Sequence, residues 1–246
     1  MLTNAELAIT RKALGPIGVS LPGSLTASTP IRLQRDAVAR LERAGYRTMW
    51  TNEVLGKDAL VQLGVLLAAT EGTVFGTCIA NIWARPAQTM HAAAAQLAEA
   101  YPGRLALGLG VGYPEQAASV GREFGRPLST TRDYLARMDE RTWPPAPEAV
   151  YPRIVAANGP KMVALAADIA DGAMPAMQSA SFTAQARETL GPDKLLVVGL
   201  SATPDSPAEV RAHIAAGADH VTLLTPLDGD FETGVDTLER FSPAVL

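Results

Sequence analysis

Short apolar runs alternate with helical patterns along nearly the whole chain, and this alternation constrains the fold more than any single motif does. Eight strands are predicted, at Ile17–Leu21, Thr48–Thr51, Val74–Ala80, Leu105–Leu109, Ile154–Ala156, Gly172–Ala176, Leu195–Gly199 and His220–Leu224. A helix is predicted after each, at Pro30–Ala44, Lys57–Ala69, Thr89–Ala100, Pro127–Arg137, Pro160–Ala170, Ser181–Leu190, Pro207–Ala216 and Phe231–Phe241. The strands are continuously apolar, which is typical of a parallel sheet covered on both faces. Eight such units in 246 residues predict an α/β fold, a (βα)8 TIM barrel forming one domain over residues 1–246, and leave a doubly wound sheet as the alternative.

One segment interrupts this rhythm after the fourth predicted helix. Thr142–Tyr151 reads TWPPAPEAVY, and its three prolines exclude both a helix and a strand. We expect a shortened connection here. It is either a surface linker, which is the simpler interpretation, or a lid over the site.

Composition excludes several classes of partner. Lys and Arg total 21 against 25 Asp and Glu, a net charge of −4 without any basic run, which argues against nucleic acid and anionic membranes. Cys78 is the only cysteine, and the three histidines stand apart, so neither a disulfide framework nor a local metal motif is predicted. Met1–Leu14 has no apolar core of secretory type, and glycines and prolines within Ala13–Ile31 exclude a membrane span. We expect a soluble, cytoplasmic protein.

In a barrel of this kind the active site lies at the carboxyl ends of the strands. Pro22 follows the first predicted strand, and Trp50, Asn52 and Glu53 stand at the end of the second. Glu53 is the only carboxylate within that strand end, and a buried acid beside an indole could exchange protons near neutrality. The alternative is an acid that stabilises the amino end of the following helix.

Glycines punctuate the end of the fourth predicted strand. Gly108, Gly110 and Gly112 alternate there, but Tyr113 and Pro114 follow where a dinucleotide fingerprint would place its third glycine and helix. The series therefore indicates either backbone contact with a ligand or close packing at a strand end.

A second loop has the features of an anion site. Asn158, Gly159 and Pro160 open a predicted helix, and Lys161 adds a positive charge. Free backbone N–H groups and the helix dipole at such a position favour a phosphate. An ordinary loop-to-helix turn is the alternative.

Taken together, three stretches resemble a known family. Thr77–Pro86, Pro102–Val111 and Asn158–Met162 are similar to the corresponding stretches of the bacterial luciferase-like monooxygenase superfamily. The resemblance is closer to its actinobacterial branch, which uses the deazaflavin coenzyme F-420, and it covers roughly Pro16–Pro226. The fold that it implies is a (βα)8 barrel, in agreement with the strand count.

The resemblance also implies roles for individual residues. A bulge with a non-prolyl cis peptide, expected at Cys78–Ile79 in the third strand, would support the cofactor ring from behind, with Ala80 and Asn81 continuing the strand. Gly110, Gly112 and Tyr113 would lie along the ring edge and ribityl chain. The cofactor phosphate would contact Asn158, Gly159, Pro160 and Lys161.

The implied chemistry is hydride transfer between C5 of the deazaflavin and a small organic substrate. Pro22, Trp50 and Asn52 would face the substrate, and Glu53 or Tyr113 would donate or accept the proton. Family members often carry an acidic residue or His where Gly112 and Tyr113 stand here, and commonly His in place of Glu53. These departures leave a non-catalytic cofactor-binding barrel as one alternative. An FMN-dependent monooxygenase on the same fold is another, because the motifs do not distinguish the two cofactors.

Relatives of this kind often pair, so a homodimer is a further option. The alanine-rich segments 92–95 and 164–167 could line its interface.

Overall fold

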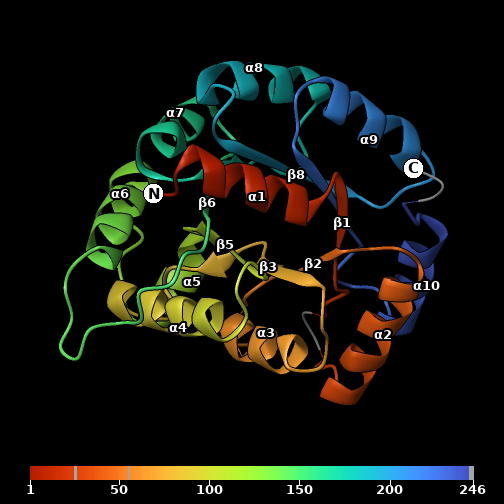
Figure 1. Ribbon diagram of the computed structural model, residues 1–246, viewed down its shortest axis with the longest axis horizontal. Helices are drawn as coiled ribbons and strands as arrows, with labels where there is room; N and C mark the ends of the chain where they lie inside the picture. The colour runs from red at the N-terminus through yellow and green to blue at the C-terminus, as the bar shows by residue number, and fades with distance from the viewer. Residues whose placement is uncertain (25–26, 55, 244–246) are drawn as a thin grey trace.

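A computed structural model describes residues 1–24, 27–54 and 56–243. Its strands are all parallel and surround a central axis (Figure 1). They are β1 (Ile17–Ser20), β2 (Thr48–Thr51), β3 (Val74–Thr77), β4 (Ala80–Asn81), β5 (Leu105–Gly110), β6 (Arg153–Ala156), β7 (Gly172–Met174), β8 (Leu195–Ser201) and β9 (His220–Leu224). β3 and β4 are two halves of the third barrel strand, and both pair with β5. The pairing of β3 with β5 closes the ring, so the TIM barrel is confirmed and the open sheet is excluded.

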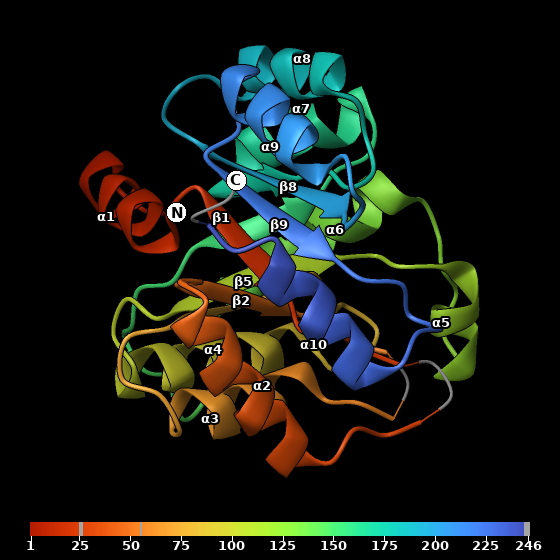
Figure 2. The same cartoon turned by 90° about the vertical axis from the view of Figure 1, so that its right-hand side faces the viewer.

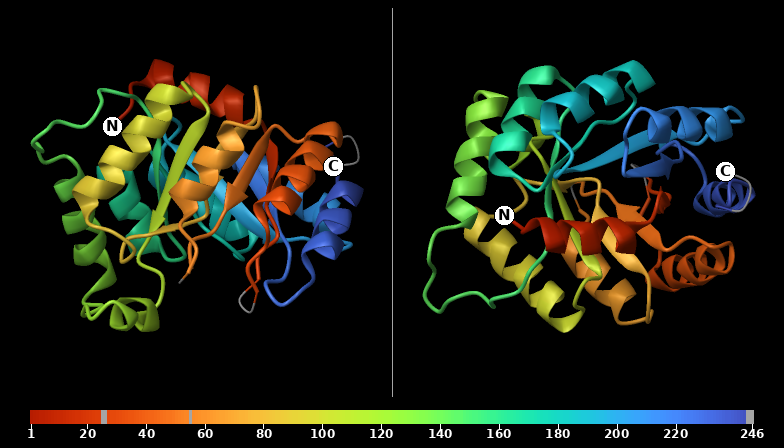
Figure 3. Two further views of the ribbon diagram at one scale, coloured as in Figure 1. Left: turned by 90° about the horizontal axis from the view of Figure 1, so that it is seen from below. Right: turned by 45° about the horizontal axis from the view of Figure 1, so that its top comes forward.

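Helices form the outer ring of this barrel. The eight that follow the strands are α2 (Ile31–Arg43), α3 (Ala59–Leu67), α4 (Ala87–Ala100), α6 (Pro127–Met138), α7 (Pro160–Ile169), α8 (Ala180–Leu190), α9 (Ser206–Ala215) and α10 (Phe231–Arg240). Two helices were not predicted, α1 (Asn4–Leu14) before the first strand and α5 (Pro114–Ser119) after β5. They lie at opposite ends of the barrel (Figure 3, left).

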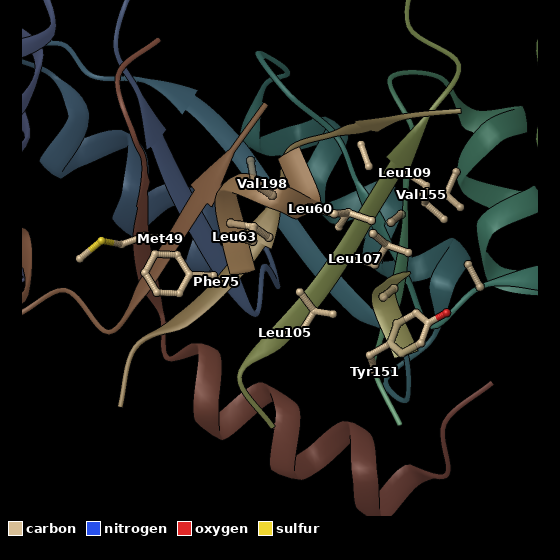
Figure 4. Packing of buried hydrophobic residues seen from close by; sticks show 14 of the residues in the cluster. Met49, Leu60, Leu63, Phe75, Leu105, Leu107, Leu109, Tyr151, Val155 and Val198 are labelled. Atoms are coloured by element: carbon tan, nitrogen blue, oxygen red, sulfur yellow. The ribbon is translucent and has the colours of Figure 1, made fainter. Parts of the chain in front are cut away.

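Alternate residues of each strand enter different layers of the core. Leu105, Leu107 and Leu109 of β5 pack outward in the main cluster between strands and helices (Figure 4), whereas Ala106 belongs to the smaller cluster inside the barrel. Both faces of β5 are thus covered by apolar side chains, and most residues of the other strands are buried too. This is why the strands read as continuous apolar runs rather than as alternation.

Helix α1 closes the amino end of the barrel. Its Leu7 and Leu14 join the interior cluster, and the Arg11 Nε atom lies 2.7 Å from Asp219 Oδ1. The helix begins with a capping box in which Thr3 and Glu6 each bind the other's backbone N–H. α1 therefore seals the barrel at the end opposite to the one where TIM barrels carry their sites.

The proline-rich connection runs from the end of α6 into the amino end of β6. It is irregular from residue 139 to 152 and contains a cis peptide between Trp143 and Pro144. The Trp143 side chain is 97% exposed. Because the segment enters β6 at its amino end, it lies on the α1 side of the molecule (Figure 3). It is a surface linker, and the lid alternative is wrong.

The alanine-rich segments mainly serve this chain's own packing. Ala94, Ala95 and Ala166 are fully buried against the barrel. Their small side chains let α4 and α7 approach the strands closely. In the described part of the chain, no helix is both long enough and apolar enough to cross a membrane.

Candidate functional site

Three adjoining cavities open at the carboxyl ends of the strands. The largest, of about 830 Å³, runs from the loop after β1 to the start of α3, and we call it the groove cavity. The mouth cavity, of about 400 Å³, lies over β1, the break in the third strand and β9. The charged cavity, of about 410 Å³, lies between the β2–α3 loop and the loop after β4. Gly23 and Asn52 line both the groove and mouth cavities, and Lys57, Asp58 and Gln116 line both the groove and charged cavities.

Glu53 lies at the centre of a buried ion-pair cluster in the charged cavity. Its carboxylate accepts two hydrogen bonds from the Arg85 guanidinium, and backbone N–H bonds from Ala59 (3.0 Å) and Asn81 (2.8 Å). Arg85 reaches on to Asp58, whose Oδ2 lies 3.0 Å from Nη2. The Glu53 and Arg85 side chains are only 2% and 10% exposed. Glu53 thus ties the end of β2 to β4 and to the first turn of α3.

This environment differs from the expected one, in which an indole lay beside the acid. Trp50 is fully buried in the cluster inside the barrel, and its Nε1–H donates to Nε2 of His220 at 3.0 Å. The side chains of successive strand residues point to opposite faces, and that of Trp50 points to the closed interior. The structure therefore places Trp50 away from the cavities. Ala80 is also fully buried.

Lys57 reaches back from the loop before α3 to the end of β2. Its Nζ donates to Thr51 Oγ1 at 2.8 Å and to Asn52 Oδ1 at 2.9 Å. Burial lowers the pKa of the Lys57 ammonium to about 8, and the nearby Cys78 and Glu53 oppose the shift. A lysine in this state exchanges a proton close to physiological pH.

The third barrel strand is broken where the family resemblance placed a bulge. The Cys78–Ile79 peptide bond is cis, which confirms that expectation. The Cys78 side chain lines the mouth cavity, with its sulfur 3.5 Å from Ser20 Oγ, and burial raises the pKa of its thiol to about 11. Ile79 turns against β5, where a Cβ on Gly110 would lie 2.4 Å from Ile79 Cδ1. The missing side chain at Gly110 thus leaves room for Ile79 beside β5.

The turn after β5 is shaped by a second glycine. Gly112 has φ of +56°, and a Cβ there would lie 1.9 Å from Gln116 Oε1. That oxygen accepts the backbone N–H of Tyr113 at 2.9 Å, which holds the start of α5. The Tyr113 side chain is 71% exposed at the rim. The turn therefore presents Gln116 to the groove and charged cavities and leaves Tyr113 outside them.

The predicted phosphate loop lies at the carboxyl end of β6. Asn158 Oδ1 accepts the Ala176 N–H at 2.8 Å, and Gly159 precedes the first turn of α7. The N–H groups of Met162 and Val163 already bind the Gly159 carbonyl, and Pro160 has none. Among the described residues, no acceptor is recorded for the N–H of Lys161, so a ligand can use it. No protein atom lies within 4 Å of a Cβ built on Gly159, so the loop is open.

The structure thus brings together only part of the predicted site. Pro22, Asn52, Glu53, Cys78 and Asn81 line the three cavities, whereas the Asn158–Lys161 loop lies outside their lining. Sequence reasoning assigned no role to Arg85, Lys57 and Gln116. The available signal was position, because each follows the carboxyl end of a strand, but it does not tell which of many such residues turns inward.

A family comparison decides what this barrel is. The model of the luciferase-like monooxygenase family matches residues 17–191. The chain belongs to this family. Among the curated relatives of this luciferase-like barrel is a protein of Mycobacterium tuberculosis named as a coenzyme F-420-dependent oxidoreductase, 29% identical over 182 residues. Another is the 5,10-methylenetetrahydromethanopterin reductase of Methanolobus tindarius, 28% identical over 151 residues.

These alignments cover only part of each chain. They take in 61% and 54% of the luciferase-like barrel but 52% and 46% of the two relatives, so it spans about half the length of the curated relatives it matches. Among solved structures, an F-420-dependent secondary alcohol dehydrogenase in complex with an F-420–acetone adduct superposes with a TM-score of 0.73 at 16% identity, covering 94% of this chain and 99% of that one. Apo-MsnO8 gives 0.69 at 14% identity, with 95% and 98% covered. At these identities the likeness shows the fold.

Proposed function

We propose that this luciferase-like barrel binds coenzyme F-420 at the carboxyl end of the strands and transfers a hydride between it and a small organic substrate. The observation that carries the proposal is the broken third strand, which opens directly onto the mouth cavity through Cys78. The name of the Mycobacterium tuberculosis relative supports the choice of cofactor. The names of both curated relatives, an oxidoreductase and a reductase, support the reaction class.

The dimensions of the site fit a ring and a substrate side by side. The mouth and groove cavities of about 400 and 830 Å³ share Gly23 and Asn52, and small-molecule sites span roughly 300–1,000 Å³. In this proposal the ring lies over Cys78 and Ile79, with Asn81 and Gly110 at its edge. The substrate enters through the groove cavity, past Pro22 and Asn52.

The remaining predicted contacts are on the rim. We assign Gly112 and Tyr113 to the ribityl chain, and the open loop Asn158–Lys161 to the phosphate, where the Lys161 N–H and the α7 dipole favour an anion. Bound there, the deazaflavin supplies the hydride. The protein's part is to hold the ring and substrate in register and to exclude water from the mouth.

Glu53 has a different part from the one predicted for it. Both of its oxygens are engaged by Arg85 and by backbone N–H groups, so the carboxylate fixes the β2–α3 loop and the loop after β4. We therefore propose it as a positioning residue. Tyr113, exposed at the rim, keeps its hydroxyl available to a bound ligand.

A fluorescence titration of the purified protein with F-420, run in parallel with FMN, tests the proposal. Saturable binding of F-420 and not of FMN is the expected result. Tight binding of FMN alone would move the assignment to an oxygen-activating monooxygenase, which oxygen consumption with reduced FMN would then report. Binding of neither would contradict the cofactor assignment.

A further inference from the structure

Lys57 lines both the groove and charged cavities, and it is hydrogen-bonded to Asn52, which also lines the mouth cavity. We propose that Lys57 gives and takes the proton at the substrate oxygen, so that the substrate is a carbonyl compound or the corresponding alcohol. This inference rests on the hydride-transfer function proposed above. It adds a catalytic residue that neither the motifs nor the family resemblance assigned.

The position of the ammonium is fixed by its partners. Thr51 Oγ1 donates its own hydrogen to Gln62 Oε1 at 2.8 Å, so its lone pairs are left to accept from Lys57. Asn52 Oδ1 holds the same Nζ at 2.9 Å. Two of the three N–H groups are thereby directed at the end of β2. Among the described residues, no acceptor is recorded for the third, which is the one a ligand can use.

Asn52 connects the amine to the place where the substrate would sit. It lines both the mouth cavity, beside Cys78, and the groove cavity. A carbonyl oxygen bound beside the Asn52 amide therefore lies within reach of Nζ. General acid catalysis requires a proton donor within hydrogen-bond reach of the reacting group.

The nearby carboxylates leave Lys57 free for this role. Glu53 and Asp58 both pair with Arg85. In the described chain neither forms an ion pair with Lys57, which keeps neutral oxygen partners instead. Burial without a directly paired charge is the condition that lowers the pKa of an amine, here to about 8. The Cys78 thiol facing it has a pKa of about 11 and so stays protonated over the same range.

The step balances in both directions. In reduction, the carbonyl carbon would receive a hydride, with its electron pair, from the reduced deazaflavin, and the C=O π pair would move to oxygen. That oxygen takes a proton from the Lys57 ammonium, giving the alcohol, and the neutral amine is reprotonated from water. The coenzyme is oxidised and the carbonyl compound is reduced. In oxidation, the neutral amine would remove the hydroxyl proton, the freed pair would form the C=O π bond, and the hydride would pass from the alcohol carbon to the oxidised deazaflavin.

Other candidates for the proton are less well placed. The Glu53 carboxylate accepts bonds from Arg85, Ala59 and Asn81, and Tyr113 lies outside the cavity lining. His220, at the closed end of the barrel, is fully buried against Trp50.

The first test measures the amine itself, without cofactor. Labelling with trinitrobenzenesulfonate at a series of pH values, followed by peptide mass spectrometry, gives the midpoint at which each lysine becomes reactive. Lys57 should become reactive near pH 8, well below the value of about 10.4 for an ordinary lysine amine. A Lys57 midpoint near that ordinary value would overturn the proposal.

The second test uses Lys57→Gln and Lys57→Arg, with Lys12→Gln on the exposed face of α1 as the control. F-420 affinity should change less than twofold in all three. Oxidation of reduced F-420 by a panel of simple ketones and aldehydes should fall at least about a hundredfold in both Lys57 variants, since general acid catalysis contributes 10²–10⁴-fold. The arginine keeps the charge but cannot release a proton. The wild-type pH profile should show a limb near 8 that both variants lose.

The outcomes separate this inference from the function beneath it. Wild-type protein that binds F-420, with Lys57→Gln as active as wild type, overturns the role of Lys57 and leaves the cofactor assignment standing. Binding of F-420 with no turnover of any carbonyl compound in the panel overturns the substrate class. Wild-type protein that does not bind F-420 overturns both proposals.

Discussion

The two ends of the barrel differ in the side chains that they enclose. At the amino end, α1 covers an interior filled by Trp50, Met174 and other apolar side chains, and His220 is fully buried beside Trp50. At the carboxyl end, which is the α5 end in Figure 2, Lys57 and Asp58 line both the groove and charged cavities, and Glu53 and Arg85 line the charged cavity. The interior beneath α1 is packed with apolar side chains, whereas the cavities at the open end are lined by charged side chains that the protein must orient.

This difference predicts which substitutions should change stability and which should change ligand binding. A residue at the closed end should change the free energy of unfolding and leave ligand binding alone. A residue at the open end should do the reverse, unless it belongs to the Glu53–Arg85 pair, which serves both stability and site geometry.

The largest effect is expected from Trp50→Ala at the closed end. Removing a fully buried indole leaves a cavity and deprives His220 Nε2 of its donor, which should lower the free energy of unfolding by about 3–5 kcal/mol. Trp143→Ala is the matched control, because its side chain is 97% exposed and its loss should change stability by less than about 0.5 kcal/mol. Urea denaturation of both variants measures the contrast. Equal losses would mean that the closed end is not the stabilising core.

Glu53→Gln should have the next largest effect, and it should lower both stability and F-420 affinity. The amide keeps the shape but leaves the Arg85 guanidinium with only Asp58 as a charged partner, which should cost about 2 kcal/mol. F-420 affinity should fall as well, because Asn81 loses a charged acceptor for its N–H. Chemical denaturation and a fluorescence titration report the two effects. Glu71→Gln, on an exposed loop, is the control, and a Glu53→Gln protein as stable as that control would contradict the structural role.

The sequence predicted the barrel strands better than it predicted the break in the third strand or helix α1. All eight barrel strands were predicted because continuous apolar runs and proline or glycine boundaries are local signals. The third strand was predicted without a break from its residues alone, and only the family resemblance placed the bulge at Cys78–Ile79. Helix α1 was missed although Thr3 and Glu6 form a capping box, because only Leu7 and Leu14 are buried and they pack against residues far away in the sequence.

The site was harder to predict because side-chain direction depends on tertiary contacts. Trp50 and Asn52 are two positions apart at one strand end, yet only Asn52 reaches the cavities. The partner of Glu53 is Arg85, 32 residues further along the chain, and no local pattern links the two.

The closed end should also make stability depend on pH. Trp50 Nε1 can only donate, so His220 Nε2 must be an acceptor, and Nδ1–H then donates to the Gly15 carbonyl at 2.7 Å. Burial accordingly lowers the pKa of His220 to about 4. Below pH 6.5 the unfolded chain takes up this proton first, so stability should fall as the pH drops from 6.5 towards 4, by up to about 1.4 kcal/mol per pH unit, and is fully present above 6.5.

Denaturation curves at several pH values measure this slope. His220→Gln should flatten this dependence of stability on pH. His91 is half-buried and hydrogen-bonded to Tyr151, and His91→Gln should leave most of the slope unchanged. An unchanged slope in His220→Gln would show that the acid sensitivity comes from elsewhere.

Gly159→Val should have the smallest effect on stability and a clear one on binding. Gly159 has φ of −145° and ψ of 154°, extended backbone that any residue adopts. A Cβ there meets no protein atom within 4 Å, so the folded state should change by less than about 0.5 kcal/mol. The branched side chain would, however, occupy the space in front of the Lys161 N–H. If the cofactor phosphate sits there, F-420 affinity should fall at least about tenfold, or about 1.4 kcal/mol.

Gly191→Val is no suitable control, since its φ of 74° would strain the chain, so Gly159→Ala provides the graded comparison. A stable Gly159→Val protein with wild-type affinity would place the phosphate elsewhere and confine the open end's ligand to the three cavities.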